Sequence, residues 1–389
     1  MKSLSIIVPV YNEEEGVKEI IERLLKHKKV LEKKLDFVEI IFVDDGSKDS
    51  TYSILKNYEK EVRIIKHEKN KGYGAALKTG FKESKGELIS FLDADCTYPP
   101  EYLIKLVEKI EKEDADLVIG SRFGKKTRMP KLRFLGNKVF AFFLRILTNS
   151  KASDTASGMR VFKRKILPYV FNLPDGLEFT PAMSTKLYNE SFKIEEIPIP
   201  YSERKGRSKL SVIKHGIRFL YSIFNLAILY NPLTIFGLIG GIFLLLSIFL
   251  SIFPIIFYLQ NNRVPDFLFY RAVAITLFSY IGLSSILFGY LANKIVSIWT
   301  GVNIKNNLIT KIIYNNFFMN NYAKIGFIFV IFSILLNNRT ILQYITTGHI
   351  YVHWSYIILG ITFFLLGIQI LFSKLILNIL EQVRYKRKI

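Results

Sequence analysis

The sequence predicts an α/β domain built on a mostly parallel sheet, followed by an α-helical membrane domain. In the first 200 residues, short runs that are almost wholly apolar alternate with longer charged stretches of helical spacing. That alternation is typical of a parallel sheet covered by helices on both faces. After Tyr230 the chain is apolar and carries 12 Lys and Arg but only 2 Asp and Glu, which indicates segments that lie in lipid.

The expected strands are short and rich in β-branched residues. They are Leu4–Val10, Val38–Val43, Arg63–Lys66, Leu88–Leu92 and Leu117–Gly120. Stretches such as Glu13–Lys28 and Pro100–Lys112 lie between them and have the spacing of amphipathic helices. Because ligands of open parallel sheets bind at the carboxyl ends of the strands, the residues that follow each strand are the candidates for a site.

Acidic residues follow the second and fourth expected strands, as Asp44-Asp45 and Asp93-Ala94-Asp95. Asp93 and Asp95 point to the same side of an extended segment, so both can bind one divalent cation. Oxygen ligands favour Mg²⁺ or Mn²⁺, with a diphosphate and water completing the shell. The triplet Asp114-Ala115-Asp116 has the same spelling but precedes a strand, so we expect it to form a solvated turn.

Four spanning helices are expected within residues 231–389, at 233–259, 272–293, 322–338 and 354–373. The first is about 40 Å long at roughly 1.5 Å per residue, enough to cross a bilayer with tilt. Nine basic residues flank the spans on the side of the N-terminal domain, against Arg263, Arg271 and Arg339 in the opposite loops. We therefore expect a multi-pass cell-membrane protein with its N-terminal domain in the cytoplasm.

Two basic, aromatic stretches are expected to lie at the membrane surface. Lys131–Leu147 mixes Lys and Arg with Leu and Phe, and residues 209–230 repeat that composition directly before the first span. Amphipathic helices of this kind bind the interface of anionic lipid.

The composition also excludes several classes of protein. The lone cysteine allows no disulfide framework, and five scattered His leave no zinc ligand set. The net charge is +21, and nearly half of it belongs to the membrane half. Basic residues beside spanning helices account for that share, so we expect no nucleic-acid partner. No internal repeat is apparent.

Four motifs occur as an ordered set at the expected strand ends. They read Ser-Ile-Ile-Val-Pro-Val-Tyr-Asn-Glu (5–13), Val-Asp-Asp-Gly-Ser-Lys-Asp (43–49), Asn-Lys-Gly-Tyr-Gly-Ala-Ala (70–76) and Asp-Ala-Asp (93–95). The set resembles the inverting family-2 glycosyltransferases, which have the GT-A fold. Segments 99–101, 154–160 and 204–210 are further similar to the dolichyl/polyprenyl-phosphate sugar synthases. The resemblance covers about residues 3–225, and it implies a GT-A domain at 1–208.

The resemblance implies a role for each matching residue. Asp93 and Asp95 match the metal–diphosphate ligands, and the catalytic roles fall to Asp95 and Arg122. Arg122 matches a basic residue near the phosphates, and both it and Arg133 match positions that meet the lipid phosphate. The positions that hold the nucleotide-sugar are Pro9, Tyr11, Asn12, Glu13, Asp44, Asp45, Asp93, Ala94, Asp95, Thr97, Arg204 and Lys209. The last two belong to a basic loop that closes over the donor diphosphate.

One departure from the family pattern bears on the donor. Members of the mannosyl type read Asp-Ala-Asp-x-Gln-His-Pro-Pro, whereas this chain has Thr97-Tyr98 where they have Gln-His. That form is similar to relatives that use UDP-sugars, so we favour UDP-hexose or UDP-N-acetylhexosamine over GDP-mannose. Glucose, N-acetylglucosamine and mannose all stay open.

The resemblance thus implies transfer of one sugar to dolichyl or polyprenyl phosphate with inversion, for glycoconjugate or protein glycosylation. A lipid monophosphate is largely dianionic at neutral pH, so it needs no dedicated base. The alternatives are a processive polysaccharide synthase and a translocator of lipid-linked sugar. Processive enzymes carry a Gln-x-x-Arg-Trp motif, and residues 1–230 contain no Gln. A homo-oligomer is possible.

Overall fold

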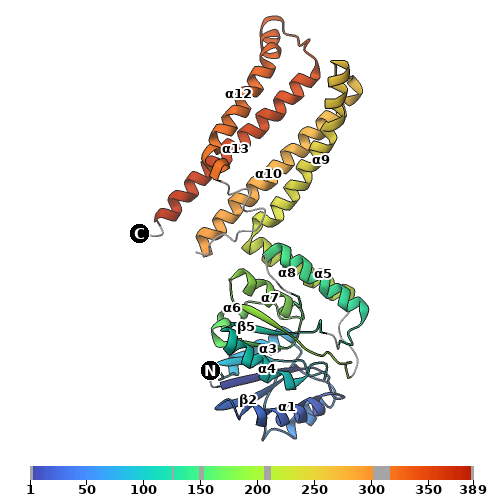
Figure 1. The fold of residues 1–389 in the computed structure, drawn as a ribbon, viewed down its shortest axis with the longest axis vertical. Coiled ribbons are helices and arrows are strands. Elements are labelled where there is room, and N and C mark those ends of the chain that lie inside the picture. Colours follow the sequence, from blue (N-terminus) through green and yellow to red (C-terminus); the bar gives the residue numbers. More distant parts are fainter. Residues whose placement is uncertain (1–2, 125–126, 149–152, 206–211, 301–315, 387–389) are drawn as a thin grey trace. The chain divides into compact units, whose positions relative to one another are not determined.

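The computed structural model describes residues 3–124, 127–148, 153–205, 212–300 and 316–386 (Figure 1). It divides into two compact units, Met1–Leu226 and Ala227–Ile389. Each unit is described by itself below.

The first unit is built on a seven-stranded sheet of order β3-β2-β1-β4-β6-β5-β7. β6 is antiparallel to both of its neighbours, and the other pairs are parallel. The strands are β1 (Ser3–Val10), β2 (Phe37–Asp44), β3 (Arg63–Lys66), β4 (Leu88–Phe91), β5 (Leu117–Ser121), β6 (Arg160–Lys163) and β7 (Ile194–Pro198). The expectation of a mostly parallel sheet is confirmed.

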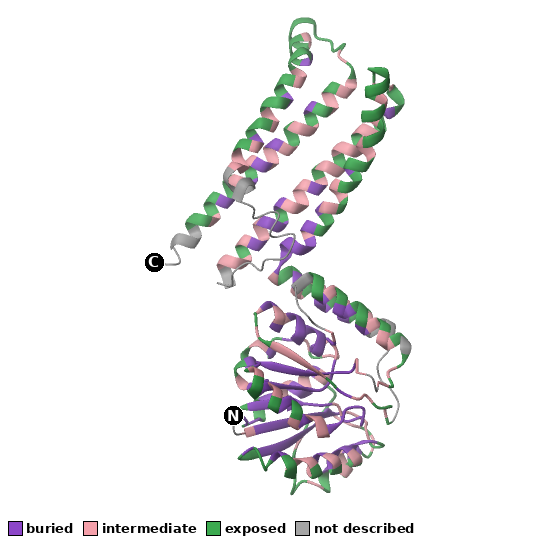
Figure 2. Cartoon of the chain, viewed as in Figure 1, coloured by how far each residue is buried: buried purple, intermediate pink, exposed green. Residues whose placement is uncertain are grey.

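Helices cover both faces of this sheet, because successive residues of its strands point to opposite faces. Ile6 and Val8 of β1 enter one core with α1 and α4, while Ile7 enters the other with α3 and α7. The strands β1, β2, β4, β5 and β6 are almost wholly buried between these cores, whereas the edge strands β3 and β7 are partly exposed (Figure 2). The helices are α1 (Val17–Leu31), α2 (Thr51–Lys56), α3 (Tyr73–Glu83), α4 (Leu103–Glu113), α5 (Lys131–Thr148), α6 (Leu167–Val170), α7 (Phe179–Asn189) and α8 (Val212–Tyr230).

Helices α5 and α8 form a pair that leaves apolar side chains uncovered. Their rings pack together at Phe140–Phe219 and Phe143–Phe224, with centroids 5.6 and 5.7 Å apart. Large apolar residues on other sides of the same helices are exposed, namely Leu132, Leu135, Phe142, Ile217 and Tyr221. A water-soluble surface rarely carries so much exposed apolar area.

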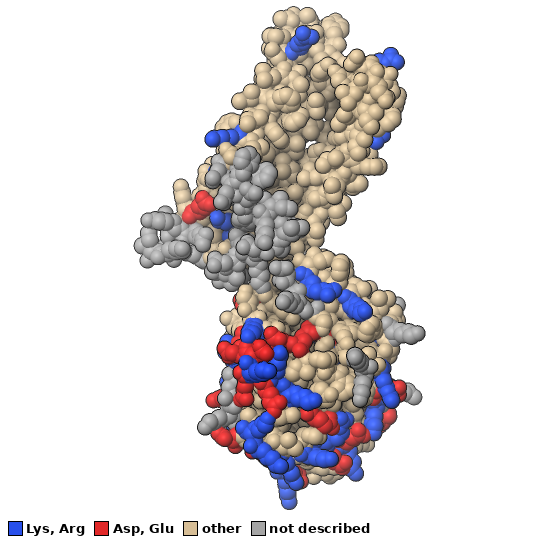
Figure 3. Space-filling view, viewed as in Figure 1, with Lys and Arg blue, Asp and Glu red and all other residues tan. Residues whose placement is uncertain are grey.

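Among its described residues, the second unit contains four helices long and apolar enough to cross a membrane: α9 (Pro232–Asn261), α10 (Phe269–Thr300), α12 (Asn316–Thr347) and α13 (Trp354–Lys386). α9 packs along α10, α12 along α13, and α10 along α13. Charged side chains are frequent on the face of the first unit that Figure 3 shows, and scarce on these helices.

Several helix ends differ from the sequence prediction, since α10 continues to Thr300 and α13 to Lys386. The third span shows the difference most clearly. Arg339, expected in an outer loop, lies inside α12, which continues to Thr347. No helix-breaking residue follows Arg339 until Gly348, whose φ of +71° ends the helix. A single charge near a span end was therefore a poor marker of the end of this helix.

Candidate functional site

Three loops that carry the predicted motifs meet at one edge of the sheet, because β2, β1 and β4 are neighbours. The loop after β1 is bonded to the loop after β2: the backbone N–H of Asn12 donates to Ser47 Oγ (2.9 Å), and that of Glu13 to Thr51 Oγ1 (2.8 Å). In return, the Lys48 N–H donates to Asn12 Oδ1 (2.8 Å). These bonds fix the positions of Tyr11, Asn12 and Glu13 relative to the second motif.

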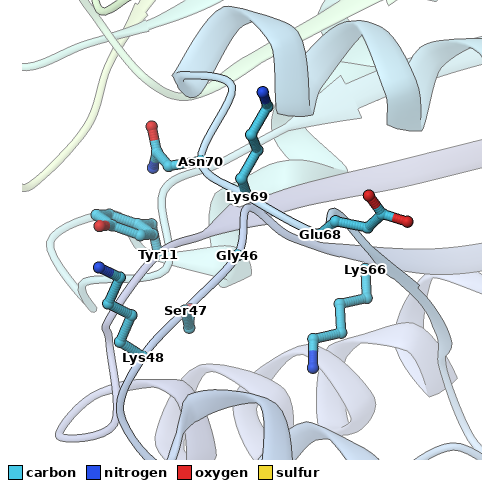
Figure 4. Close-up of a pocket in the computed structure, with 8 residues that line it drawn as sticks. All are labelled: Tyr11, Gly46, Ser47, Lys48, Lys66, Glu68, Lys69 and Asn70. Carbon is cyan, nitrogen blue, oxygen red and sulfur yellow. The ribbon is translucent and has the colours of Figure 1, made fainter.

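A pocket of about 360 Å³ opens between the loops after β1 and β2 and the segment that begins at the end of β3 (Figure 4). Its lining combines the ring of Tyr11 with the backbone of Gly46 and with three lysines that sequence analysis did not single out. The lining residues are Tyr11, Gly46, Ser47, Lys48, Lys66, Glu68, Lys69 and Asn70. An aromatic face among cations suits a planar, anionic ligand such as a nucleotide.

The two aspartates after β2 have different surroundings. Asp45 is buried, and its carboxylate accepts the backbone N–H groups of Lys71 (2.9 Å) and Gly72 (2.8 Å) and lies 2.7 Å from His67 Nδ1. It therefore braces the loop before α3. Asp44 is fully buried, and its Oδ2 has no hydrogen-bond partner within the described residues. That oxygen is itself shielded from solvent.

His67 is the residue that sequence reasoning missed here. Its Nε2 lies 3.0 Å from Thr79 Oγ1, so the ring links Asp45 to α3. The one available signal was its place directly after β3. A histidine among five that are otherwise scattered gave no reason to examine it.

Asp93 lies half-buried after β4 with its carboxylate held from two sides. The Tyr73 hydroxyl donates to Oδ1 at 2.7 Å. Gly158 packs so closely that a Cβ there would lie 2.3 Å from Oδ2. Burial, and the charge of Asp95, raise the pKa of Asp93 to about 7.

Asp95 is buried beside Ala94 and has partners on both oxygens. Its Oδ1 accepts from Thr97 Oγ1 (2.6 Å) and from the Thr97 N–H (3.2 Å). Its Oδ2 pairs with Arg204 (3.1 Å), which also forms an ion pair with Glu13. The structure thus places Arg204, predicted from a distant loop, at the acidic pair. Lys209 lies outside the described residues.

Arg122 follows β5 and is bound by a buried carboxylate. Its Nε and Nη2 donate to the two oxygens of Asp154 (2.7 and 2.6 Å), and its guanidinium lies over the Tyr201 ring. Burial tends to raise the pKa of Asp154, but the charge and hydrogen bonds of Arg122 outweigh it and lower that pKa. Arg133 lies half-buried in the first turn of α5.

The second Asp-Ala-Asp triplet is a solvated turn only in part. Asp114 is exposed, in a left-handed conformation that ends α4. Asp116, in contrast, is buried, accepts the backbone N–H of Lys193 (3.0 Å) and pairs with Lys165. The prediction was wrong for Asp116, because lysines from outside the triplet neutralise it.

The donor set suits a divalent cation with phosphate ligands better than an all-protein metal cage. Within the described ranges, no group of three or more His, Cys, Asp and Glu residues could hold a metal ion. Asp93 and Asp95 nevertheless offer carboxylate oxygens at one site. Mg²⁺ and similar cations commonly take one or two carboxylates and complete their shell with substrate phosphates and water.

Comparison with known proteins now decides the family. The model of "Glycosyl transferase family 2" matches residues 5–171. UDP-N-acetylglucosamine–dolichyl-phosphate N-acetylglucosaminyltransferase of Methanococcus voltae is 33% identical over 187 residues, which are 43% of this chain and 71% of that protein. The chain belongs to the family-2 glycosyltransferases. Residues 232–388 match a separate model, "Domain of unknown function (DUF8752)".

Other family-2 relatives extend the comparison. Undecaprenyl-phosphate 4-deoxy-4-formamido-L-arabinose transferase of Pectobacterium carotovorum is 28% identical over 78% of this chain and 91% of its own length. Low-salt glycan biosynthesis hexosyltransferase Agl6 of Haloferax volcanii is 34% identical over 56% of this chain, which spans about half (52%) of that protein. Among solved structures, glucosyl-3-phosphoglycerate synthase of Mycobacterium tuberculosis aligns with 58% of this chain and 78% of its own, at 17% identity and a TM-score of 0.48.

Proposed function

We propose that this glycosyltransferase moves one sugar from a nucleotide-diphosphate donor to dolichyl or polyprenyl phosphate, with inversion. The observation that carries the proposal is the acidic pair Asp93 and Asp95, at the same sheet edge as the Tyr11 pocket, in a chain that also has four membrane-length apolar helices. Two of the relatives are named for undecaprenyl phosphate and for dolichyl phosphate. The product is a lipid-phosphate-linked sugar for glycoconjugate or protein glycosylation.

The donor that fits best is a UDP-sugar, with GDP-mannose second. The Tyr11 pocket takes the nucleoside, together with Pro9, Asn12, Glu13 and Asp44. Thr97, in place of the glutamine of the mannosyl type, supports the uridine donor. One relative is named for UDP-N-acetylglucosamine.

The reaction is an in-line displacement at the anomeric carbon. An oxygen of the lipid phosphate dianion forms the new bond as the bond from that carbon to the donor diphosphate breaks, so no side chain has to remove a proton. Mg²⁺ or Mn²⁺ held by Asp93 and Asp95 would neutralise the leaving diphosphate. Arg204 stands at that position with a positive charge, Lys209 adds another from the same loop, and Arg122 with Arg133 attracts the acceptor phosphate.

The acceptor requires the site to work at a membrane surface. We place the α5–α8 apolar surface in the interface of the cytoplasmic leaflet, and the four helices across the cell membrane. Residues 209–230 then lie along the surface, and 231–389 anchor the enzyme. The segment 1–208 is the catalytic domain.

The test is release of nucleotide diphosphate by the full-length protein in lipid with Mn²⁺. We expect release from a UDP-sugar to need dolichyl phosphate and to stop when dolichol without phosphate is supplied. Equal release with dolichol, or with no lipid, would contradict a lipid-phosphate acceptor.

A further inference from the structure

Both carboxylates of the acidic pair accept a hydrogen bond from a neutral hydroxyl group, that of Tyr73 on Asp93 and that of Thr97 on Asp95. Tyr73 is the first residue of α3 and follows the loop that Asp45 holds through the N–H groups of Lys71 and Gly72. Its hydroxyl therefore reaches Asp93 Oδ1 from a braced position. Gly158 closes the other side, because any larger residue would collide with the carboxylate.

Thr97 orients the carboxylate of Asp95 as Tyr73 orients that of Asp93. It is 1% exposed, and both its hydroxyl and its N–H donate to Oδ1, which leaves Oδ2 for a cationic partner. The sequence prediction gave Thr97 a direct contact with the donor. In the structure its hydroxyl proton is directed at Asp95.

Neutral donors suit this task for an electrostatic reason. Two buried carboxylates repel each other and tend to rotate apart toward water. A cationic side chain would also cancel part of the charge that attracts a metal ion, as Arg204 does where it pairs with Oδ2 of Asp95. A hydroxyl fixes one oxygen and leaves the charge in place, as the outer partners of metal ligands do in general.

We propose that Tyr73 and Thr97 are positioning residues that hold Asp93 and Asp95 ready for a divalent cation. This inference rests on the proposed function, because it assumes that the pair binds the cation with the donor diphosphate. The inference goes beyond the proposed function because it assigns part of the cation affinity to Tyr73 and Thr97, which are not themselves the carboxylate ligands.

The test is Mn²⁺ binding to the full-length protein in the presence of UDP. The electron paramagnetic resonance signal of free Mn²⁺ measures how much of the ion stays unbound. Tyr73→Phe and Thr97→Val should each weaken Mn²⁺ binding about 10–100-fold. Thr97→Ser, which keeps the hydroxyl, should restore it. Tyr58→Phe is the matched control, because that hydroxyl bonds Glu22 on the exposed surface.

Two outcomes separate this inference from the proposed function. Asp95→Asn should abolish Mn²⁺ binding, and if it does not, the metal site itself is wrong. If Asp95→Asn abolishes binding while Tyr73→Phe and Thr97→Val bind like the wild type, the positioning role is wrong and the proposed function stands.

A second inference concerns the unit of unknown function. Each of its two hairpins is closed by a pair of facing glycines: Gly240 with Gly282 between α9 and α10, and Gly326 with Gly367 between α12 and α13. A Cβ on Gly240 would lie 2.5 Å from the Gly282 carbonyl oxygen, and one on Gly367 would lie 2.8 Å from that of Gly326. Only glycine allows these backbones to approach so closely.

The two hairpins also share a register. Gly240 and Gly326 lie 86 positions apart, and so do Ser247 and Ser333, Tyr258 and Tyr344, and the helix ends Asn262 and Gly348. Both ends have a left-handed residue whose N–H donates to the carbonyl of the corresponding tyrosine, at 2.8 and 3.0 Å. Helix α9 therefore corresponds to α12 residue by residue.

The contact between the hairpins follows the same spacing. Thr276 of α10 meets Thr362 of α13 with hydroxyls 2.7 Å apart, and these residues are again 86 positions apart. Further along, Gln369 donates to Ser284 (2.6 Å) and Lys294 pairs with Glu381. The two helices thus run parallel, and residues 85 to 87 positions apart meet along them, so corresponding positions lie opposite each other to within one residue, close to the arrangement at a two-fold axis.

We infer that the second unit is a tandem duplication of one helical hairpin, whose copies associate through α10 and α13. This corrects the impression that the chain has no repeat. The repeat is hidden because Leu, Ile, Phe and Val replace one another freely on surfaces that face lipid.

Sided labelling tests the inference in the full-length protein with Cys96→Ser. Cysteines placed at Arg263 and His349, at the two hairpin tips, should react with an impermeant maleimide from the same side of the membrane. The pair Thr276→Cys and Thr362→Cys should form a disulfide, whereas Gly241→Cys with Thr362→Cys should not. Tips on opposite sides, or no disulfide between 276 and 362, would overturn the duplication.

Discussion

The two units of this glycosyltransferase treat buried polar groups in opposite ways. The first buries charges and pairs them, as in Arg122 with Asp154 and Arg204 with Asp95. The second has two acids in its whole sequence, Asp266 and Glu381, one near each end of the α10–α13 contact. Between them the contacts are made by hydroxyl and amide groups.

The difference follows from the surroundings of each unit. A buried charge is costly and is kept where a charged ligand uses it. In lipid the cost is higher still, so neutral hydrogen bonds and glycine contacts hold the helices together. The buried charges therefore locate the chemistry in the first unit. Each variant below removes one of the contacts in which the two units differ.

The largest effect is expected from Asp95→Asn. Loss of this carboxylate should lower sugar transfer at least about 10²–10³-fold, because stabilisation of the leaving diphosphate is lost. Asp114→Asn is the matched control, from a triplet of identical spelling whose first residue is exposed. Transfer rates of both purified variants in lipid provide the measurement. Equal rates would mean that the acidic pair has no part in the chemistry.

The next effect is on stability. Asp154→Asn leaves Arg122 buried without its counter-charge and should cost about 3–5 kcal/mol of unfolding free energy. The carboxyl has a lowered pKa in the folded state, so its contribution is complete above the ordinary value of 3.8 and is lost as pH falls through the lowered one. Urea unfolding of the first unit, monitored by proteolysis, should show the same difference in unfolding free energy between Asp154→Asn and the wild type at pH 7 and pH 5. A difference that vanished by pH 5 would disagree with this pair.

In the second unit, Gly240→Ala should destabilise the α9–α10 hairpin by about 1–3 kcal/mol, since the new methyl meets a backbone oxygen that cannot move aside. Gly241→Ala is its neighbour and control, with nothing within 4 Å of the added carbon. Thermal unfolding in detergent would compare them. Equal midpoints would argue against close packing at Gly240.

The smallest effect is expected from Thr276→Val. One hydroxyl contact inside a membrane bundle contributes about 0.6 kcal/mol on average. A double-mutant cycle with Thr362→Val should show coupling of that size. Additive effects of the two changes would mean that the hydroxyls do not interact.

The same contrast explains what sequence could predict. The parallel sheet and the motifs at its carboxyl edge follow from local periodicity and spacing, which place Asp44 at the end of β2 and Asp93 after β4, the two strands that flank β1. The residues that contact those motifs cannot be predicted in this way. Arg204 is 109 residues away from Asp95 in the sequence, and His67 belongs to no recognisable motif. In the second unit hydropathy finds the helices, but the repeat depends on which glycines face each other. The positions that recur 86 residues apart are few, and the facing glycines showed where to look for them.

The most direct test of the account is the mass of the lipid product. Full-length protein in lipid with dolichyl phosphate and Mg²⁺ or Mn²⁺ would be offered UDP-glucose, UDP-N-acetylglucosamine and GDP-mannose separately, and the lipid fraction analysed by mass spectrometry. The account predicts a gain of one sugar with one of the donors, a UDP-sugar in the favoured case. A ladder of several sugars, or no gain with any donor, would contradict it.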